Sequence, residues 1–391
     1  MPHIFISTGE VSGDLQASYL IRSLRSQRSD LRVTALGGER VAAAGATLLH
    51  DTTAISSMGL LEALPFIVPT LRIMRRVRRW LQRDRPDVAI LVDYVGVNAR
   101  IGTLLQQQGI PVIYYIAPQE WVWHYGNAMT QRLVNFSRLM LSIFAEEERY
   151  YSAAGGNVRW VGHPLVDILQ SAPSREEARV QLGIAPETRA VMVMPASRAQ
   201  ELRAIVPVLV QAARQIQQQI PQVKVWIPLS QARFERALTR SARQAGLEVA
   251  FVRNNTRAAI AAADLILAKS GTVNLEAAIL GIPQVVVYRV HWLTAWIARK
   301  FLNFSIPFMS PPNLVQMRAI VPELLQGEAT PARVVAEALP LLVDRDRQRK
   351  LQQDYAQMRL ALGKPGAIDR AAAEVLRVLA EVEAKSGTTN T

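Results

Sequence analysis

Carboxylates follow two of the apolar segments that the sequence predicts as strands. Asp93 comes directly after residues 86–92, and Glu10 follows residues 3–7 in the loop Thr8-Gly9-Glu10-Val11-Ser12-Gly13-Asp14. A carboxylate fixed at the end of a buried strand can take a proton from a substrate hydroxyl as a general base. We therefore predict Asp93 as the base and Glu10 as a second catalytic carboxylate. The alternatives are a helix N-cap for Asp93 and satisfaction of loop amides for Glu10.

A small-residue turn, Ser270-Gly271-Thr272, joins the apolar strand at 265–268 to a helix that runs from Asn274 to Leu280. The N–H groups and the dipole at the start of such a helix favour a phosphate group. Glu276 lies about one helical turn further along, where its carboxylate can accept hydrogen bonds from two ribose hydroxyls. The same pattern also fits an ordinary crossover with a capping threonine and a surface glutamate.

Two further polar residues would complete such an anion site. Arg198 follows the predicted strand at 190–194, whose end should lie on the same sheet edge as the 270–272 turn. A guanidinium there can meet a diphosphate, although a single arginine in a basic protein is usually a solvated surface residue. Asn313, in the loop Pro311-Pro312-Asn313-Leu314, could orient a sugar or a base, or could cap its loop.

A third group follows the predicted strand at 111–116. Gln119 lies at its end, and Trp121 and Trp123 come next. The two indoles could stack on a sugar ring, but burial is the commoner fate of such side chains. His163, between Gly162 and Pro164, could contact substrate or stabilise a junction between domains, and we favour the structural or hinge role.

A parallel sheet is needed to bring these residues together. Strands alternate with helices along the first half of the chain, and a second series begins near residue 190. This alternation predicts two doubly wound α/β domains, in which ligands bind beyond the carboxyl ends of the strands. The chain is predicted to be helical from Pro322 to about Lys385, ending in an amphipathic helix.

Two segments combine apolar and basic residues. Residues 60–81 begin with an apolar stretch and continue as a helix with arginines opposite its apolar face, a pattern typical of a helix lying on anionic lipid. The alternative is a surface helix whose apolar face packs on the sheet. Residues 291–308 carry aromatic residues at helical spacing. These side chains could pack in the core or form the rim of a binding site for a hydrophobic substrate. The candidate membrane or acyl-chain residues are Leu64, Phe66, Ile67, Val68, Arg75, Arg76, Arg79, Trp292 and Trp296.

Composition limits the possible functions. The chain of 391 residues has a formal net charge of +13 and no cysteine, which excludes disulfides, thiolate catalysis and Cys-zinc sites. The charge favours phosphorylated substrates, anionic lipid or nucleic acid, but no nucleic-acid-binding pattern stands out. No apolar run reaches the roughly 20 residues of a spanning helix, and the N-terminus does not resemble a signal peptide. Asp344-Arg345-Asp346 lies in a charged helical stretch, so we predict no metal site.

Several motifs occur in one order along the chain. They are Thr8-Gly9-Glu10-Val11-Ser12-Gly13-Asp14, Met58-Gly59-Leu60-Leu61-Glu62, Trp121-Val122-Trp123, Val161-Gly162-His163-Pro164, Ser197-Arg198, Ser270-Gly271-Thr272-Val273-Asn274-Leu275-Glu276, Pro312-Asn313-Leu314 and Pro322-Glu323-Leu324-Leu325-Gln326. Together they resemble the bacterial lipid-A-disaccharide synthase family. The resemblance covers about residues 3–380. It implies a GT-B glycosyltransferase, with two Rossmann-like parallel-sheet domains facing a cleft.

The resemblance also implies a role for each domain. Residues 1–170 would bind the acceptor and would be completed by a C-terminal helix at about 365–385. Residues 171–364 would bind the UDP-sugar, and residues 386–391 would form a disordered tail. The implied UDP and diphosphate residues are Arg198, Ser270, Gly271, Thr272, Asn274, Glu276 and Asn313. The implied acceptor-side residues are Ser12, Gly13, Asp14, Asn98, Gln119, Trp121, Trp123 and His163.

The sequence departs from the family pattern at two places. The stretch Asp93-Tyr94-Val95-Gly96-Val97-Asn98 keeps the first aspartate and the asparagine of the family's D-x-P-D-F-N but lacks its Pro-Asp-Phe core. A second acidic role there would therefore be absent or supplied by Glu10 or Glu120. Ala196 replaces the glycine of the family's G-S-R, which suggests a slightly looser approach of the backbone to phosphate.

The function implied by the resemblance is transfer of 2,3-diacylglucosamine from UDP-2,3-diacylglucosamine to 2,3-diacylglucosamine 1-phosphate, with inversion and release of UDP. No cofactor and no metal are expected, because an arginine and a helix N-terminus would stabilise the leaving diphosphate. The expected location is the cytoplasm, at the inner face of the cytoplasmic membrane, with an anionic membrane surface as partner, no nucleic acid, and a possible homo-oligomer. The alternative is another GT-B enzyme that uses UDP-N-acetylglucosamine, either a 2-epimerase or a transferase with a polyprenyl-linked acceptor.

Overall fold

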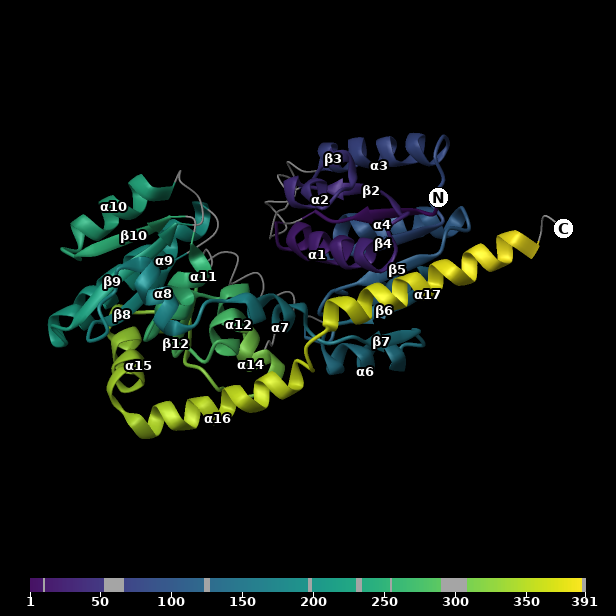
Figure 1. Cartoon of the computed structure of the whole chain (residues 1–391). Coiled ribbons are helices and arrows are strands. Elements are labelled where there is room, and N and C mark those ends of the chain that lie inside the picture. Colours follow the sequence, from purple (N-terminus) through teal and green to yellow (C-terminus); the bar gives the residue numbers. More distant parts are fainter. Residues whose placement is uncertain are drawn as a thin grey trace. The chain divides into compact units, whose positions relative to one another are not determined.

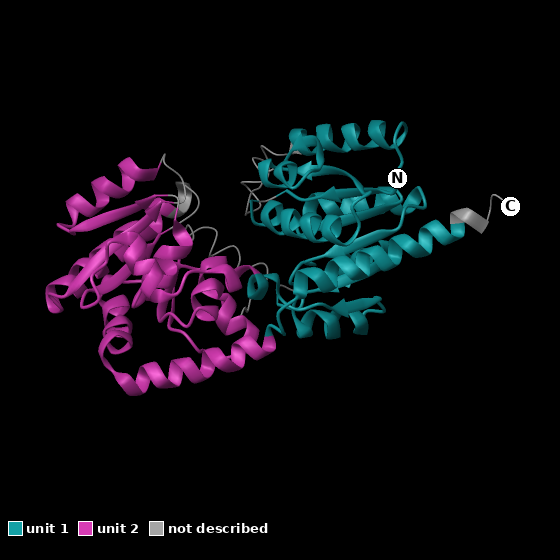
Figure 2. Cartoon of the chain, viewed as in Figure 1, with its two compact units in different colours: residues 1–167, 362–391 teal, residues 168–361 magenta. Residues whose placement is uncertain are grey.

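A computed structural model describes residues 1–9, 11–52, 67–122, 127–195, 199–229, 234–253, 255–289 and 308–388. The chain divides into two compact units, Met1–Asp167 with Leu362–Thr391, and Ile168–Ala361 (Figure 2). Each unit is built on a parallel sheet covered by helices (Figure 1), as the alternation of strand and helix patterns predicts. The fold class is therefore confirmed as two α/β domains with parallel sheets.

The first unit contains a seven-stranded sheet with the order β3-β2-β1-β4-β5-β6-β7. Its elements are β1 (His3–Ser7), α1 (Val11–Gln27), β2 (Arg32–Gly37), α2 (Glu39–Ala43), β3 (Thr47–Asp51), α3 (Ile67–Leu81), β4 (Val88–Val92), α4 (Val95–Gln107), β5 (Val112–Tyr115), α5 (Asn127–Phe136), β6 (Ser137–Ser142), α6 (Ala145–Ala153), β7 (Val158–Trp160), α7 (Pro164–Ile168) and α17 (Ala367–Thr388). The strand order reverses direction between β1 and β4. Such a switch point is where open parallel sheets bind ligands.

Helix α17 returns the chain to the first unit, where it packs along α1 (Figure 1). Ser23 of α1 donates a hydrogen bond of 2.6 Å to Asp369 of α17. Arg28, just after α1, forms a two-pronged ion pair with Glu383, with both N–O distances at 2.8 Å. The helix continues through Thr388, so residues 386–388 of the expected tail are helical, and 389–391 lie outside the described residues.

The second unit contains a six-stranded sheet with the order β10-β9-β8-β11-β12-β13. Its elements are η3 (Leu169–Ser171), α8 (Arg175–Leu182), β8 (Arg189–Met194), α9 (Ala199–Gln219), β9 (Val223–Leu229), α10 (Glu235–Gln244), β10 (Val249–Arg253), α11 (Thr256–Ala262), β11 (Leu265–Lys269), α12 (Thr272–Ile279), β12 (Gln284–Tyr288), α14 (Pro311–Gln316), β13 (Glu323–Leu325), η5 (Gln326–Glu328), α15 (Pro331–Val343) and α16 (Arg345–Ala361). Its switch point lies between β8 and β11.

One strand was not expected from the sequence. The prediction of helix from Pro322 onward is wrong at Glu323–Leu325, which forms the edge strand β13 and pairs in parallel with β12. Three residues are too few to show a strand periodicity. Leu324 is buried against the unit, so pairing with β12 and burial of this side chain decide the local conformation.

Candidate active site

Asp93 lies at the switch point of the first sheet, immediately after β4. Asp93 and Tyr94 have φ angles of 49° and 52°, in the left-handed region. The buried amide of Asn98 holds this turn by donating to the carbonyl oxygens of Asp93 at 2.7 Å and Val92 at 3.2 Å. Its oxygen accepts a hydrogen bond from the hydroxyl of Ser7 at 2.7 Å, which ties the end of β4 to the end of β1. Asn98 therefore fixes the backbone that presents Asp93.

Two neighbouring groups close around this turn. A Cβ atom at Gly9 would lie 2.2 Å from the ring of Tyr94, so only glycine permits the observed approach. The hydroxyl of Tyr114 donates to the carbonyl oxygen of Asp93 at 2.9 Å. Burial, followed by the nearby Asp93 carboxylate, holds the pKa of Tyr114 well above its ordinary value. Tyr114 therefore remains a neutral donor to this turn.

Two residues predicted for the acceptor side form the framework of the loop after β1. The carboxylate of Asp14 is buried and accepts backbone hydrogen bonds from Gly38 at 2.6 Å and Arg40 at 3.2 Å, at the start of α2. A Cβ atom at Gly13 would lie 2.1 Å from the hydroxyl oxygen of Thr8. In this structure, Asp14 satisfies helix amides and Gly13 allows close packing.

The loop after β5 carries the aromatic part of the predicted acceptor side. Gln119 and Trp121 are half-buried there, and the Trp121 ring lies 6.0 Å from the ring of Phe144. His163 packs against Phe144 at 5.2 Å, and its Nδ1 accepts a hydrogen bond from the N–H of Leu165 at 3.1 Å. Burial lowers the pKa of His163 to about 3. This neutral, buried imidazole fits the structural role that the sequence favours.

The Ser270-Gly271-Thr272 turn lies at the end of β11, at the switch point of the second sheet. The hydroxyl of Ser270 donates to the carbonyl oxygen of Met309 at 2.5 Å. The N–H of Gly271 donates to the side chain of Asn274 at 2.7 Å. Because the first N–H groups of a helix have no partner within it, Thr272 and Val273 provide the amides that α12 can offer to an anion.

The amide side chains of Asn274 and Asn313 are used within the second unit. Asn274 is buried and donates to Gln284 at 3.0 Å, and Gln284 donates back to the Asn274 carbonyl oxygen at 2.8 Å. Asn313 is also buried, and it accepts backbone hydrogen bonds from Ile320 at 2.8 Å and Val321 at 2.9 Å. Its amide nitrogen donates to the Val321 carbonyl oxygen and to the Glu323 carboxylate, both at 3.1 Å. Both asparagines stabilise the scaffold in this structure.

Glu276 is a half-buried carboxylate on α12, one turn beyond the Ser-Gly-Thr turn. Burial raises the pKa of Glu276, and the positive charge of Arg257 counteracts that rise. Lys269 ends β11, and its ammonium nitrogen lies 4.0 Å from the position of a Cβ atom at Gly271. Sequence reasoning missed Arg257 and Lys269, although the strand-end rule that selected Ser270 applies equally to Lys269.

Helix α3 decides between the two interpretations of residues 60–81, contact with lipid and packing on the sheet. Ile73, Val77 and Leu81 are buried in the core of the first unit, and Trp80 lies 5.0 Å from the ring of Phe5 (centroid to centroid). The apolar face therefore packs on the sheet, and each such burial is worth about 1.5–3 kcal/mol. The interpretation in which this face contacts lipid is wrong for the described part of the helix.

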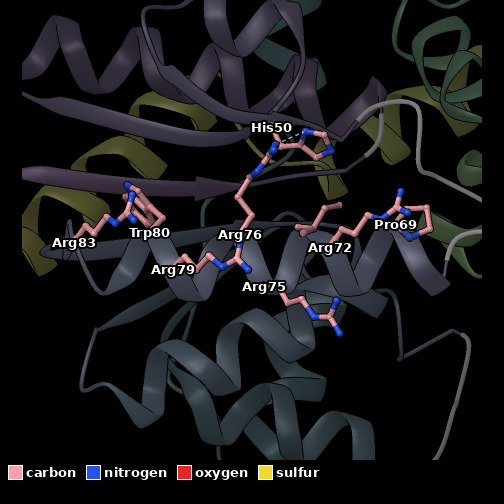
Figure 3. Close-up of a pocket in the computed structure, with 9 residues that line it drawn as sticks. His50, Pro69, Arg72, Arg75, Arg76, Arg79, Trp80 and Arg83 are labelled. Atoms are coloured by element: carbon pink, nitrogen blue, oxygen red, sulfur yellow. Dashed lines mark hydrogen bonds between the residues drawn. The ribbon is translucent and has the colours of Figure 1, made fainter.

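The opposite face of α3 is a band of arginines beside a groove of about 640 Å³ (Figure 3). Arg76 reaches His50, with 3.0 Å between its Nη1 and the ring Nδ1. This arginine band consists of Arg72, Arg75, Arg76, Arg78, Arg79 and Arg83. Apart from Arg76, these arginines form no ion pair with the described residues. Val68 and Leu71, near the start of the helix, are 54% and 47% exposed.

The remaining predicted residues lie partly within and partly outside the described part of the chain. Ser12 is exposed in the first turn of α1, and Ile67 begins α3. The candidates that lie outside the described residues are Glu10, Leu64, Phe66, Trp123, Arg198, Trp292 and Trp296. Among the candidates within the described part, Asp93, Asn98 and Gln119 follow neighbouring strands of one sheet edge, and Ser270 to Glu276 form the corresponding edge of the second unit.

Two parallel-sheet units, each with polar residues at its switch point, define the class of GT-B glycosyltransferases and related epimerases. A UDP-N-acetylglucosamine 2-epimerase from Neisseria meningitidis bound to UDP-N-acetylglucosamine has a TM-score of 0.67 at 12% identity, covering 96% of this chain and 100% of that one. MurG from Acinetobacter baumannii has a TM-score of 0.59 at 16% identity, with coverage of 96% and 100%. At these identities the similarity shows the fold alone.

Sequence comparison gives the family. The profile described as lipid-A-disaccharide synthetase matches residues 4–378. The lipid-A-disaccharide synthase of Gloeothece citriformis is 48% identical, covering 95% of this chain and 99% of the relative. That of Synechocystis is 46% identical, with coverage of 95% and 97%. The chain belongs to the lipid-A-disaccharide synthase family and is a glycosyltransferase. The alternative of another enzyme using UDP-N-acetylglucosamine, either a 2-epimerase or a transferase with a polyprenyl-linked acceptor, is therefore not favoured.

Proposed function

We propose that the protein transfers 2,3-diacylglucosamine from its UDP donor to 2,3-diacylglucosamine 1-phosphate, forming a β-1,6-linked disaccharide 1-phosphate and UDP. The observation that carries this proposal is family membership over residues 4–378. The positions of Asp93 and of the Ser270–Glu276 segment at the two sheet switch points support it.

In the proposed reaction the 6-hydroxyl oxygen of the acceptor attacks the anomeric carbon of the donor. The bond from that carbon to the diphosphate oxygen breaks, its electron pair leaves with UDP, and the hydroxyl proton passes to Asp93. Attack opposite the leaving group inverts the anomeric centre. Asn98 supports this step by fixing the Asp93 backbone at 2.7 Å, and Glu10 is the second carboxylate that the sequence suggests for this step.

The second unit would hold the donor. The N–H groups at the start of α12 and the guanidinium of Arg198 would stabilise the diphosphate as negative charge develops on it. The ammonium group of Lys269 lies beside the same turn and adds positive charge. Glu276 would accept hydrogen bonds from the ribose. With these groups in place, we propose that neither a metal ion nor another cofactor is needed.

Substrates with acyl chains require access to a lipid surface, and we propose that the arginine band of α3 provides it. Among the described residues, no helix is long and apolar enough to cross a bilayer. Exposed arginines without acidic partners attract anionic head groups, at about 1 kcal/mol per residue. The exposed Val68 and Leu71 could enter the head-group region beside them. The proposed location is the inner face of the cytoplasmic membrane.

The test is to incubate the purified protein with UDP-2,3-diacylglucosamine and 2,3-diacylglucosamine 1-phosphate. The expected result is release of one UDP for each disaccharide formed, with activity retained in a chelator. UDP release that does not depend on the acceptor would contradict the transfer. Loss of activity in the chelator, restored by added metal, would contradict the metal-free mechanism.

A further inference from the structure

A buried carboxyl group lies behind the aromatic loop of the first unit. Glu147 is fully buried in the first turn of α6. One of its oxygens, Oε2, accepts backbone hydrogen bonds from Ile143 at 2.9 Å and Phe144 at 3.4 Å. These bonds cap the helix, and they fix the position of the carboxyl group after β6. They leave its other oxygen, Oε1, for a different partner.

Trp121 supplies a complementary group at the same place. Within the part of the chain that the structure describes, neither Oε1 of Glu147 nor the indole Nε1 of Trp121 makes a hydrogen bond of normal geometry, and both atoms are buried. Both side chains adjoin Phe144: the Trp121 ring lies 6.0 Å from the Phe144 ring, and the Phe144 N–H donates to Glu147 Oε2 at 3.4 Å. The indole N–H also lowers the pKa of Glu147, as a nearby donor does. Leaving a buried donor and a buried acceptor unpaired is costly, so each of these two atoms is a suitable partner for the other.

Other side chains of α5 and α6 hold the rest of the same loop. Tyr151 of α6 donates to the carbonyl oxygen of Pro118 at 2.7 Å. Thr130 of α5 donates to the buried carboxylate of Glu120 at 2.7 Å. Pro118 and Glu120 of this loop are thus held by side chains of α6 and α5. Glu147 lies one turn before Tyr151 on the same face of α6. Trp121 is the part of the loop that Glu147 can reach.

The Glu147 carboxyl group retains its proton near neutral pH. Burial, aided by the Asp93 carboxylate and opposed by the hydrogen bonds from Ile143, Phe144 and Trp121, raises the pKa of Glu147 to about 8, so the group is mainly neutral at pH 7. The other titratable groups that it affects or faces are Tyr151 of its own helix and Asp93 after β4. Because Oε2 accepts two amide hydrogens, the proton belongs on Oε1. A hydroxyl at Oε1 can accept a hydrogen bond from the indole and donate another.

We propose that Glu147 is a positioning residue for the acceptor: its buried carboxyl group fixes the Trp121 indole and thereby the loop that follows β5. The proposal rests on the proposed function, since it assumes that this loop contacts the acceptor sugar. Glu147 itself touches no reacting atom. Its effect should therefore fall on the acceptor and leave the donor, which the second unit would bind, unchanged.

A double-mutant cycle tests the proposal. Glu147→Ala, Trp121→Phe and the double variant are compared with the wild type by kcat/KM for the acceptor and KM for the UDP-sugar. Each single change should lower the acceptor kcat/KM about tenfold, and the double variant should lose little more than either one. The donor KM should stay within about twofold. Independent losses that multiply in the double variant, or an equal rise in both KM values, would overturn the proposal.

Two further variants serve as controls for this test. Glu147→Gln retains an oxygen for the Ile143 and Phe144 amides, so it preserves the helix cap and replaces Glu147→Ala if that variant fails to fold. It should recover part of the acceptor kcat/KM, and a loss as large as that of Glu147→Ala would count against positioning through Oε1. Glu146→Gln, on the same turn and paired with Arg149 at the surface, should match the wild type. A wild type that releases no UDP would refute the proposed function itself.

Discussion

The side chain of Asn98 donates a hydrogen bond of 2.7 Å to the carbonyl oxygen of Asp93. This contact explains how two consecutive non-glycine residues remain in the left-handed region, with φ angles of 49° at Asp93 and 52° at Tyr94. Such a conformation costs on the order of 1–3 kcal/mol per residue. The same amide binds the Val92 carbonyl oxygen, and its oxygen binds Ser7. Asn98 therefore couples the two central strands to the proposed base.

Replacing Asn98 should reduce catalysis and fold stability but not donor binding. Asn98→Ala removes the bonds that hold the Asp93 turn, so kcat should fall at least tenfold. The free energy of unfolding should decrease by about 1–3 kcal/mol, because buried partners lose their hydrogen bonds. Urea unfolding, kcat and UDP affinity are the measurements. Arg100→Ala, on an exposed position of the same helix, is the control. Unchanged kcat at reduced stability would show that the turn does not orient the base.

Asp93 itself should be required for the chemical step. Asp93→Asn keeps the shape of the side chain but removes the proposed proton acceptor, so kcat should fall by roughly 10²–10⁴, the range for a general base. The Kd for UDP should not change, because the donor groups belong to the other unit. Asp30→Asn, at an exposed position of the same unit, serves as control. Full activity of Asp93→Asn would reassign the base, with Glu10 as the next carboxylate to replace.

The strand-end positions of the candidate site could be predicted because they depend on local patterns. The apolar runs before Asp93 and Ser270 are strands β4 and β11, and parallel sheets place such strand ends at one edge. The roles of individual polar side chains could not be predicted this way. Asn98 has a partner far away in the sequence, Ser7, and Asn313 binds Val321 in the segment that leads into β13. Only the folded chain shows that these amides are occupied.

Glu147 and α3 show the same limit for charged and amphipathic segments. The sequence Glu146-Glu147-Glu148 reads as an acidic first turn of a helix, and nothing local indicates that the middle carboxyl group is fully buried. The amphipathic pattern of α3 is compatible with packing on either lipid or protein, because both offer an apolar surface. The sheet, with Phe5 against Trp80, decides the question in favour of protein.

The pH dependence of UDP binding should follow Glu276. Its pKa is raised by burial, and Arg257 opposes that rise. If the ionised carboxylate binds the ribose, UDP affinity should decrease as the pH falls through the pKa of Glu276. Arg257→Ala removes the stabilising charge, so this loss should begin at higher pH than in the wild type. Isothermal titration of UDP across a pH series measures the midpoint, and Arg240→Ala on α10 should leave it in place. A midpoint that stays or moves lower in Arg257→Ala would contradict the assignment.

Glu147 should make the protein less stable as the pH rises. Its pKa is about 8 in the folded state against an ordinary value of 4.5. Between these values the folded state retains a proton that the unfolded state has released, so this group's contribution is fully present below 4.5 and is lost as the pH approaches 8. The slope approaches about 1.4 kcal/mol per pH unit. Urea unfolding between pH 5 and 8.5 should show this slope in the wild type and in Glu146→Gln. Glu147→Gln should lack it, and an equal slope in that variant would place the titration elsewhere.

The arginine band of α3 should bind anionic vesicles through charge. Arg72, Arg75 and Arg79 are exposed on α3 and line the groove beside it. At about 1 kcal/mol per arginine, reversing all three to glutamate should weaken binding to phosphatidylglycerol vesicles by at least roughly 100-fold at low salt. Raising the salt should weaken wild-type binding in the same direction, because the Debye length shortens to about 10 Å at 0.1 M. Vesicle sedimentation measures both effects.

A matched charge change separates this surface from the net charge of the protein. Arg236, Arg240 and Arg243 are exposed on α10 of the second unit, and their reversal to glutamate changes the total charge by the same amount. If the band of α3 is the contact surface, this control should keep most of the wild-type affinity for vesicles. Equal losses in the two triple variants would mean that long-range attraction by the +13 chain, and no particular helix, brings the protein to the membrane.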